Sequence, residues 1–198
     1  MTKVIAITGG IGSGKTTLSE HLKKKSFLVH ESDGFVSNMY KSPNKHFIGF
    51  LCKNISQDVV KKGRINKKKV AEIIFSNDKA KEKIEKYIHK QVQISRDSFI
   101  KKNKKTKKKF IFVDIPLLLE NKLEKKFDLV VSIISKKKIR MKRALKNKNF
   151  SKHILNKIIK SQTTDKERRS RSQIIINNNK TKKDFIFSAE KSLIKILK

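Results

Sequence analysis

Short apolar runs recur along the chain, and polar or turn-forming residues bound each of them. Strands buried in a parallel sheet typically show such continuous runs, rich in Val, Ile and Leu. Five runs are predicted to be strands: Lys3–Ile7, Phe27–His30, Phe110–Asp114, Leu129–Ile134 and Gln173–Ile176.

Segments with apolar residues three and four positions apart separate these runs, and this spacing predicts amphipathic helices. The predicted helices are Gly14–Lys24, Asp33–Tyr40, Lys67–Phe75, Asp78–Lys101, Lys136–Lys148, Ser151–Gln162 and Phe185–Leu197. Strands that alternate with helices indicate a parallel sheet with helices on both faces. We therefore expect an α/β fold with a five-stranded parallel sheet.

The middle third of the chain contains no strong strand pattern, only helical periodicity. We interpret residues 42–109 as a helical insertion in a core made of residues 1–41 and 110–198. The lysine-rich stretch Lys101–Lys109 is predicted to be a solvated loop.

The formal net charge is +34, which raises the possibility of a nucleic-acid partner. However, only seven of the 51 basic residues are arginines, the side chain best suited to bidentate recognition of phosphate and guanine. Lysine, asparagine and isoleucine are abundant in every segment, which favours a compositional bias over a binding patch. We expect no nucleic-acid partner, although a field of this sign should attract anionic nucleotides.

The single cysteine, Cys52, excludes a disulfide framework and is typical of a reducing compartment. The N-terminus does not resemble a signal peptide, and no apolar run approaches the roughly 18 residues of a membrane span. We expect a cytoplasmic protein without a membrane partner.

The segment Gly9–Thr16 reads GGIGSGKT and matches the P-loop pattern of glycine, four residues, then Gly-Lys-Ser/Thr. Glycines let the backbone approach an anion, and the N–H groups of such a turn form a concave anion site at a helix N-terminus. Lys15 would lie beside the β and γ phosphates of ATP, and the Thr16 hydroxyl would bind Mg²⁺. The predicted phosphate-binding residues are Gly12, Ser13, Gly14, Lys15, Thr16 and Thr17.

A P-loop occurs in kinases, GTPases and motor ATPases. No clear Asn-Lys-x-Asp motif for guanine recognition follows the loop, which disfavours a GTPase. The chain length and the helical insertion favour a kinase of small molecules. A basic nucleic-acid-binding protein with a vestigial P-loop is the alternative from a different class.

The segment Thr8–Thr17 closely resembles the opening of bacterial dephospho-CoA kinases. The resemblance extends over nearly the whole chain, through segments that match further motifs of that family. They are His30–Asp33, Gly63–Phe75, Ile84–His89, Ile115–Glu120 and the later Gln162.

This resemblance implies transfer of the ATP γ-phosphoryl group to the ribose 3′-hydroxyl of dephospho-CoA, the last step of coenzyme A synthesis. It implies ATP and Mg²⁺ as cofactors, a P-loop nucleotide domain, a helical CoA-binding insertion and a lid at about residues 140–171. Another small-molecule kinase, such as a nucleoside, shikimate or gluconate kinase, is the alternative enzyme. We expect a monomer or a small homo-oligomer.

The resemblance also assigns roles to single residues. Asp33 matches the catalytic acid, which could accept the hydroxyl proton and contact substrate, although a helix N-cap explains the same position. Lys15 and Arg140 would act on the transferred phosphoryl group, and Asp114 would order Mg²⁺ through water or cap its strand. The residues expected to contact substrate are Thr8, Asp33, His89, Leu118 and Arg140.

Further residues of the family pattern are kept or changed. Arg140 and Arg143 lie where lids of the family supply arginines to the phosphates, whereas a further lid arginine is replaced by Asn147. Glu120 is predicted to stabilise the turn that follows it, and Glu31, in place of an Asp, to support the metal site. The adenine-side turn reads Ile176-Asn177-Asn178-Asn179-Lys180 and lacks the glycine of the family. An asparagine there can still adopt positive φ and contact a base.

Overall fold

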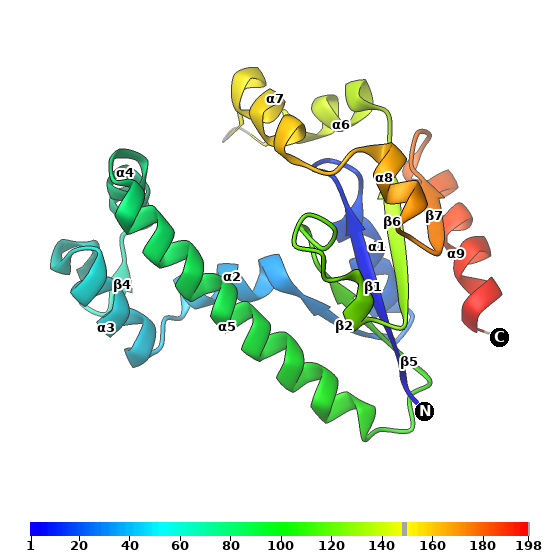
Figure 1. Cartoon of the computed structure of the whole chain (residues 1–198), viewed down its shortest axis with the longest axis horizontal. Coiled ribbons are helices and arrows are strands. Elements are labelled where there is room, and N and C mark those ends of the chain that lie inside the picture. Colours follow the sequence, from blue (N-terminus) through cyan, green and yellow to red (C-terminus); the bar gives the residue numbers. More distant parts are fainter. Residues whose placement is uncertain (148–149, 198) are drawn as a thin grey trace. The chain divides into compact units, whose positions relative to one another are not determined.

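The computed structural model of the chain describes residues 1–147 and 150–197. It forms two compact units, shown in Figure 1. The P-loop unit comprises Met1–Glu31 and Ile100–Lys198, and the helical unit comprises Ser32–Phe99. The predicted insertion, residues 42–109, therefore begins and ends later in the chain than the helical unit. The unit begins earlier because α2 (Ser32–Lys41) contacts strand β4 (Arg64–Ile65) of the helical unit, a tertiary contact without a sequence signal.

All five apolar runs form strands of one parallel sheet, which confirms the predicted fold class. The strands are β1 (Lys3–Gly9), β2 (Leu28–Glu31), β5 (Phe110–Asp114), β6 (Leu129–Ile134) and β7 (Ile174–Asn177). Their order is β2-β5-β1-β6-β7, so β1 is central. Because the strands are parallel, the carboxyl ends of β1, β5 and β6 lie at one edge of the sheet, where open α/β sheets bind ligands.

The core of the P-loop unit lies between the sheet and two helices. Helix α1 (Lys15–Lys24) supplies Leu18 and Leu22, and helix α9 (Lys182–Leu197) supplies Phe185. These side chains pack against residues of all the inner strands, including Ile5 and Phe112. The packing holds the start of α1 directly at the end of β1, which positions the intervening glycine loop.

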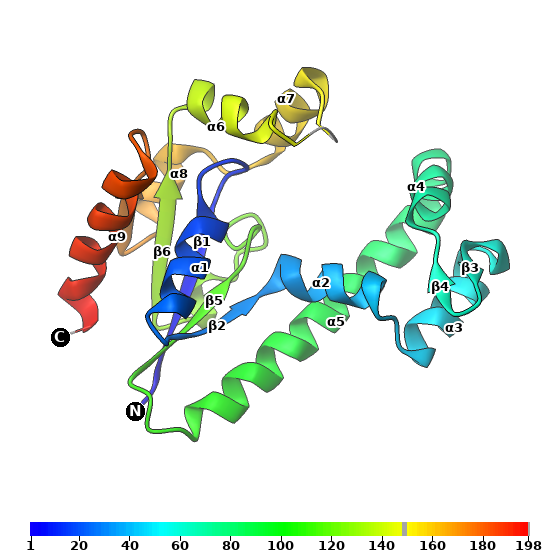
Figure 2. The same cartoon turned by 180° about the vertical axis from the view of Figure 1, so that it is seen from behind.

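Three further helices follow β6 in the P-loop unit. They are α6 (Lys137–Ala144), α7 (Lys152–Ser161) and α8 (Asp165–Ser170), and α6 and α7 lie at the end of the sheet where β1 enters its loop (Figures 1 and 2). Helix α6 ends before the predicted limit, and Lys148 lies outside the described residues. Ser151 caps α7 by accepting a hydrogen bond from the amide of Ile154.

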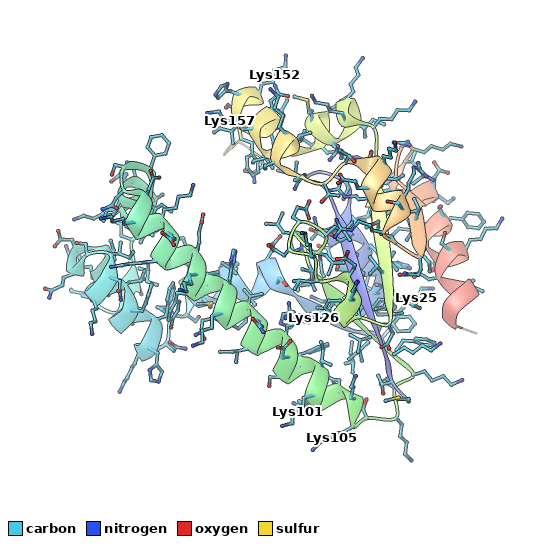
Figure 3. All side chains as sticks on the ribbon, in the orientation of Figure 1. Lys25, Lys101, Lys105, Lys126, Lys152 and Lys157 are labelled. Atoms are coloured by element: carbon cyan, nitrogen blue, oxygen red, sulfur yellow. The ribbon has the colours of Figure 1, made fainter. Side chains whose placement is uncertain are left out.

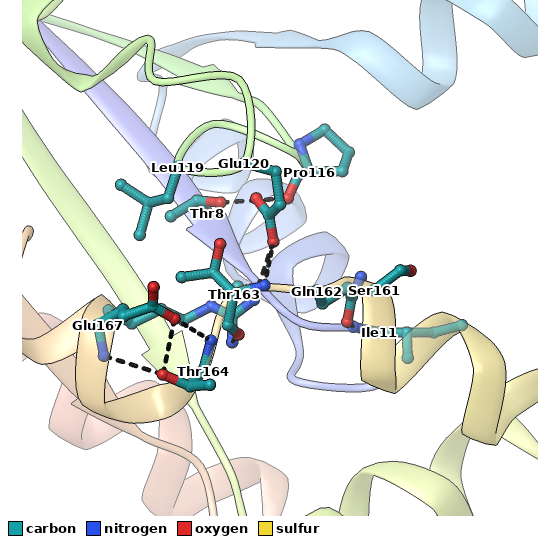
Figure 4. Close-up of polar contacts among 12 residues, drawn as sticks. Thr8, Ile11, Pro116, Leu119, Glu120, Ser161, Gln162, Thr163, Thr164 and Glu167 are labelled. Carbon is teal, nitrogen blue, oxygen red and sulfur yellow. Dashed lines mark hydrogen bonds and ion pairs between the residues drawn. The ribbon is translucent and has the colours of Figure 1, made fainter.

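Helix α8 is absent from the prediction because six residues are too few to show helical periodicity. Its start nevertheless carries a sequence signal, a capping box between Thr164 and Glu167. The side chain of each residue accepts the backbone N–H of the other (Figure 4). The hydrogen bonds from the backbone and hydroxyl of Thr164 lower the pKa of the Glu167 carboxyl.

The helical unit contains more structure than its sequence pattern indicates. Besides α2 it has α3 (Lys45–Asn54), the 3-10 helix η1 (Gln57–Val59), α4 (Lys67–Ser76) and α5 (Asp78–Lys104), whose last turn belongs to the P-loop unit. The prediction of a loop from Lys101 is therefore wrong for the first four residues. Phe47 and Leu51 of α3 are buried and pack with Val70 and Ile84.

A β-hairpin in the helical unit contradicts the prediction that this region lacks strands. Strands β3 (Val60–Lys61) and β4 (Arg64–Ile65) pair antiparallel around Lys62 and Gly63, which have φ of 49° and 72°. Positive φ at both central residues is the geometry of a two-residue hairpin turn. Strands of two residues are too short to produce an alternating pattern, so the sequence analysis missed them.

The helices of the described residues were also compared with the requirements of a membrane span. None of them is both long enough and apolar enough to cross a bilayer.

Candidate active site

The loop between β1 and α1 has the backbone geometry of a P-loop. Strand β1 ends at Gly9 and α1 begins at Lys15, so the predicted order of strand, glycine loop and helix is confirmed. Gly12 and Gly14 have φ of 71° and 110°, a region that side chains with a Cβ rarely adopt. The amide of Ser13 donates to the carbonyl of Gly10 at 3.0 Å and closes the turn.

Helix α6 lies directly against this loop. A Cβ atom on Gly10 would be 2.1 Å from Nη1 of Arg140, and one on Gly12 would be 2.4 Å from the carbonyl oxygen of Arg140. Gly12 is therefore required both by its positive φ and by the backbone of α6, whereas a side chain at Gly10 would displace the Arg140 guanidinium. The structure thus places Arg140 beside the P-loop, where the sequence analysis expected an arginine.

Arg140 is a buried cation without a partner among the described residues. Its side chain is only 7% exposed, and no described residue forms an ion pair or hydrogen bond with the guanidinium. Burying an unpaired charge is costly, so such a group is typical of a site that binds an anion.

A second buried arginine, Arg168 of α8, lies near Arg140. It is 1% exposed and donates to the carbonyl of Thr163 and to the carboxylates of Asp165 and Glu120. Burial lowers the pKa of the Arg168 guanidinium and the charge of Arg140 lowers it further, against the opposing effect of the two carboxylates. Arg168 was not predicted from the sequence, although the scarcity of arginine pointed to it as much as to Arg140.

The segment between α7 and α8 is tied to the P-loop and to the loop after β5 (Figure 4). Oε1 of Gln162 accepts a hydrogen bond from the amide of Ile11 at 2.9 Å. Oε1 of Glu120 accepts one from the amide of Thr163 at 2.8 Å. Glu120 therefore stabilises a segment distant in sequence, and its predicted role in the following turn is wrong.

The remaining predicted phosphate-binding residues lie around the loop as expected from their positions. Nζ of Lys15 donates to the carbonyl of Gly9 at 3.0 Å, and Thr16 is exposed in the first turn of α1. Ser13 is buried, and Thr17 is partly exposed.

Two predicted residues lie at the carboxyl edge of the sheet next to the loop. The hydroxyl of Thr8 donates to the carbonyl of Pro116 at 3.2 Å (Figure 4), and Thr8 is almost fully buried. The Asp114 carboxylate accepts a hydrogen bond from the hydroxyl of Ser19 on α1 at 3.1 Å. Asp114 is opposite Ile7 of β1 in the sheet, and its bond with Ser19 directs the carboxylate to α1, the helix that also carries Thr16.

Within the described residues, no three His, Cys, Asp or Glu side chains gather into a metal-binding group. Mg²⁺ commonly binds through one or two protein oxygens together with phosphates and water. Thr16 and Asp114 are oxygen donors of the required kind on adjoining elements.

The residues predicted to act on the acceptor have different surroundings. Asp33 is exposed in the first turn of α2, and His89 is exposed on α5, both in the helical unit. Glu31, the last residue of β2, forms an ion pair with Lys23. Leu118 is completely buried, which favours a packing role over the predicted substrate contact because no part of its surface is accessible.

Arg143 has a different role from the one predicted. Its guanidinium donates to the carbonyl and Oδ1 of Asn178, at 3.0 and 3.1 Å, and to the carbonyl of Lys180 at 3.3 Å. The prediction that Arg143 serves the phosphates is therefore wrong for this structure, because the turn after β7 occupies its donors. Asn147, predicted to replace a lid arginine, is exposed beyond the end of α6.

Comparison with known proteins finds one family that matches almost the whole chain. The family model described as dephospho-CoA kinase matches residues 3–184. The dephospho-CoA kinase of Fusobacterium nucleatum is 34% identical over 192 residues, with 95% of each chain covered. That of Bartonella henselae is 31% identical, with 98% of this chain and 99% of the relative covered.

The fold agrees with a solved structure as well. The structure titled dephospho-CoA kinase from Campylobacter jejuni superimposes with a TM-score of 0.73 at 23% identity, covering 99% of this chain and 98% of the other. Because the family model spans most of the residues, the chain belongs to the dephospho-CoA kinase family.

Proposed function

We propose that this chain transfers the γ-phosphoryl group of ATP to the ribose 3′-hydroxyl of dephospho-CoA and so forms coenzyme A. Membership of the family supports the reaction, and the geometry around the P-loop supports the part that concerns ATP. The observation that carries the proposal is the buried guanidinium of Arg140, which lies against the P-loop and has no partner within residues 1–147 and 150–197.

The phosphates of ATP would bind in the turn of residues 12–17. The left-handed backbone at Gly12 and Gly14 directs successive N–H groups inward, and α1 adds the positive end of its dipole. A phosphate oxygen is a stronger acceptor for the Lys15 ammonium than the carbonyl of Gly9, which it contacts in this structure. Lys15 would therefore turn to the phosphates.

Arg140 would bind the transferred group from the side opposite the loop. Charge spreads over the phosphoryl oxygens in the transition state, and a cation already in place stabilises it without reorganisation. Arg140 is suited to this role because its guanidinium is held at Gly10 while no described carboxylate neutralises it. By contrast, Glu120 and Asp165 balance the charge of Arg168, which makes Arg168 a positioning residue for the loop it contacts.

Magnesium would be held with the phosphates. The Thr16 hydroxyl would bind the ion directly, and Asp114, fixed by Ser19, would bind one of its waters. When bound, the ion neutralises phosphate charge and helps to orient the chain of phosphates.

The acceptor would be bound by the helical unit, with Asp33 as the residue that receives the hydroxyl proton. The Asp33 carboxylate lies in an exposed first helical turn, where a substrate hydroxyl can reach it. His89, also exposed on the helical unit, would contact the same substrate.

A panel of acceptors tests the reaction. Purified protein with Mg-ATP should phosphorylate dephospho-CoA, and mass spectrometry should place the phosphate on the ribose 3′-hydroxyl. Shikimate, gluconate and nucleosides should be poor acceptors under the same conditions. No transfer to dephospho-CoA by folded protein that binds Mg-ATP would reject the proposed substrate.

An Arg140→Gln variant tests the role of the buried cation. We expect turnover to fall by roughly 10²–10³-fold, the range for loss of one preorganised charge-stabilising group. The melting temperature without nucleotide should not fall, because the variant removes an unpaired buried charge. Arg169→Gln, an exposed arginine in the same part of the chain, is the control and should leave turnover unchanged. Equal losses in both variants would contradict the role.

The large positive charge calls for a separate interpretation. The exposed lysines labelled in Figure 3 are distributed over α5, α7, η2 (Glu124–Lys126) and adjoining loops of the P-loop unit. Such a spread supports a general attraction of anionic substrates over a nucleic-acid site. A cytoplasmic location and a monomer or small homo-oligomer remain predictions, and ultracentrifugation would test the second.

A further inference from the structure

Asn178 connects the turn after β7 with the P-loop. It is only 5% exposed, and its backbone amide donates to the carbonyl of Ile134 at 2.9 Å. Its side-chain Nδ2 donates to the carbonyl of Ser13 at 2.7 Å, across 165 positions of sequence. The contact is buried, so water does not compete for the Ser13 carbonyl.

Arg143 determines which way the Asn178 amide points. The guanidinium donates to Oδ1 of Asn178 at 3.1 Å and to its carbonyl at 3.0 Å. Because a guanidinium can only donate, the oxygen end of the amide must face Arg143 and the NH₂ end must face Ser13. The residue on α6 thus orients the residue that contacts the loop.

The contact with Ser13 fixes a peptide plane of the P-loop. A trans peptide is planar, so the N–H of Gly14 points away from the carbonyl of Ser13. Holding that carbonyl against Asn178 therefore directs the Gly14 N–H to the opposite side of the loop. Residue 14 must also be a glycine for Asn178 to come this close, since a Cβ on Gly14 would lie 2.4 Å from Nδ2 of Asn178.

Helix α6 carries both Arg140 and Arg143, three positions apart. Arg140 lies against the glycines of the P-loop, and Arg143 binds Asn178, which contacts that loop. We propose that Arg143 and Asn178 are positioning residues. They orient the phosphate-binding amides of the P-loop and fix the position of that loop relative to Arg140. The expected effect on kinase turnover rests on the proposed function, whereas the expected effect on phosphate affinity does not.

A role in base recognition is the competing interpretation of Asn178. The family resemblance places this turn on the adenine side of the nucleotide. The two ends of the Asn178 amide, however, already contact Ser13 and Arg143. A positioning role predicts an effect on any triphosphate, and base recognition predicts an effect only on nucleotides.

The test uses an Asn178→Asp variant of the full chain. The aspartate keeps the shape and the contact with Arg143 but places an oxygen against the carbonyl of Ser13. Calorimetry should show weaker binding of both Mg-ATP and inorganic Mg-tripolyphosphate, by a similar factor on the order of tenfold to a hundredfold. Asn121→Asp, an exposed asparagine of the same unit, is the matched control and should bind both ligands normally.

An Arg143→Lys variant provides a second test should Asn178→Asp fail to fold. Lysine keeps the charge but cannot hold the carbonyl and Oδ1 of Asn178 together. The Arg143→Lys variant should bind Mg-ATP and Mg-tripolyphosphate more weakly, by a similar factor for both that is smaller than for Asn178→Asp. The exposed control Arg169→Lys should bind both ligands normally. With active protein, the KM for ATP should rise and kcat should fall, while the KM for dephospho-CoA stays the same.

Two outcomes would overturn the proposal. Loss of Mg-ATP binding with normal tripolyphosphate binding would assign Asn178 to the base. A lower melting temperature with normal affinity for both ligands would assign the contacts to stability alone. Absence of kinase activity in the unmodified protein would reject the proposed function, yet the two affinities would still decide the positioning role.

Discussion

The two units of the molecule hold their candidate functional residues in opposite ways. In the P-loop unit, the buried polar side chains of Arg140 and Asn178 lie against the nucleotide loop, and the buried Arg168 binds Glu120 and Asp165. In the helical unit the buried cluster around Phe47 is apolar and aromatic, and Arg96 is buried as well, but the residues expected to contact substrate, Asp33 and His89, are exposed. Buried side chains therefore fix the geometry of the predicted phosphate site before a ligand binds, whereas the predicted acceptor residues lie on a surface.

A Lys15→Ala variant should have the largest effect in this comparison. Removing the ammonium from the phosphate site should lower turnover by about 10³-fold or more and weaken Mg-ATP binding, because no other described cation donates within the loop. The melting temperature should change little. Lys24→Ala, an exposed lysine of the same helix, is the control. Retained turnover in Lys15→Ala would break the assignment of the loop.

An Asp33→Asn variant tests the other unit. Loss of a proton acceptor should lower kcat by roughly 10²–10⁴-fold, whereas the affinity for Mg-ATP should remain normal. Steady-state kinetics with calorimetry separates the two effects. Asp58→Asn removes an exposed carboxylate from the same unit and should be nearly neutral. Weaker Mg-ATP binding in Asp33→Asn would show that Asp33 serves the nucleotide instead.

A Phe47→Ala variant tests whether the two units lose stability independently. Phe47 is 1% exposed and stacks near Tyr40 and Tyr87, so its truncation should destabilise the helical unit by about 3–5 kcal/mol. Hydrogen exchange should accelerate in α3 and much less in β1. Phe75→Ala, at a side chain that is 94% exposed, is the control. Uniform acceleration in both units would contradict independence.

The smallest expected effect concerns acid stability of the P-loop unit. Burial acts to raise the pKa of the Glu124 carboxyl, but hydrogen bonds and the charge of Arg171 outweigh it, and the net pKa is lowered. The stabilisation is thus present above the ordinary carboxyl pKa of about 4.3 and is lost as the pH falls below it.

A Glu124→Gln variant should accordingly lose up to about 1 kcal/mol of unfolding free energy at neutral pH and nothing below about pH 3. Urea unfolding at several pH values measures the difference. A constant difference across this range would show that the loss is not linked to ionisation of Glu124. The exposed control is Glu20→Gln on α1.

The sequence predicted the parts of the fold that have a local signal. Continuous apolar runs located all five strands of the sheet, and the glycine pattern located the P-loop between β1 and α1. The hairpin β3–β4 and helix α8 were missed because each element is too short to repeat its pattern more than once. Helix α3 is long enough, yet its apolar face was not recognised.

The site was predictable only in part, for a related reason. Arg140 was found through its position in the family pattern and the scarcity of arginine. Arg143 was assigned the same role on the same grounds, and only its contact with Asn178 distinguishes it. Arg168 carried the same compositional signal but no local motif, so it was missed.

Local patterns in the chain were sufficient to specify the strands and the glycine loop, because hydrophobic periodicity and backbone freedom act over a few neighbouring residues. The type of reaction came from the resemblance to a family along nearly the whole chain. The partners of the buried polar groups depend on tertiary structure. Ser13 meets Asn178, and Ile11 meets Gln162, across more than 150 positions of sequence. Such contacts form only once the sheet is assembled, and their burial is what gives a hydrogen bond or an unpaired charge its energetic weight.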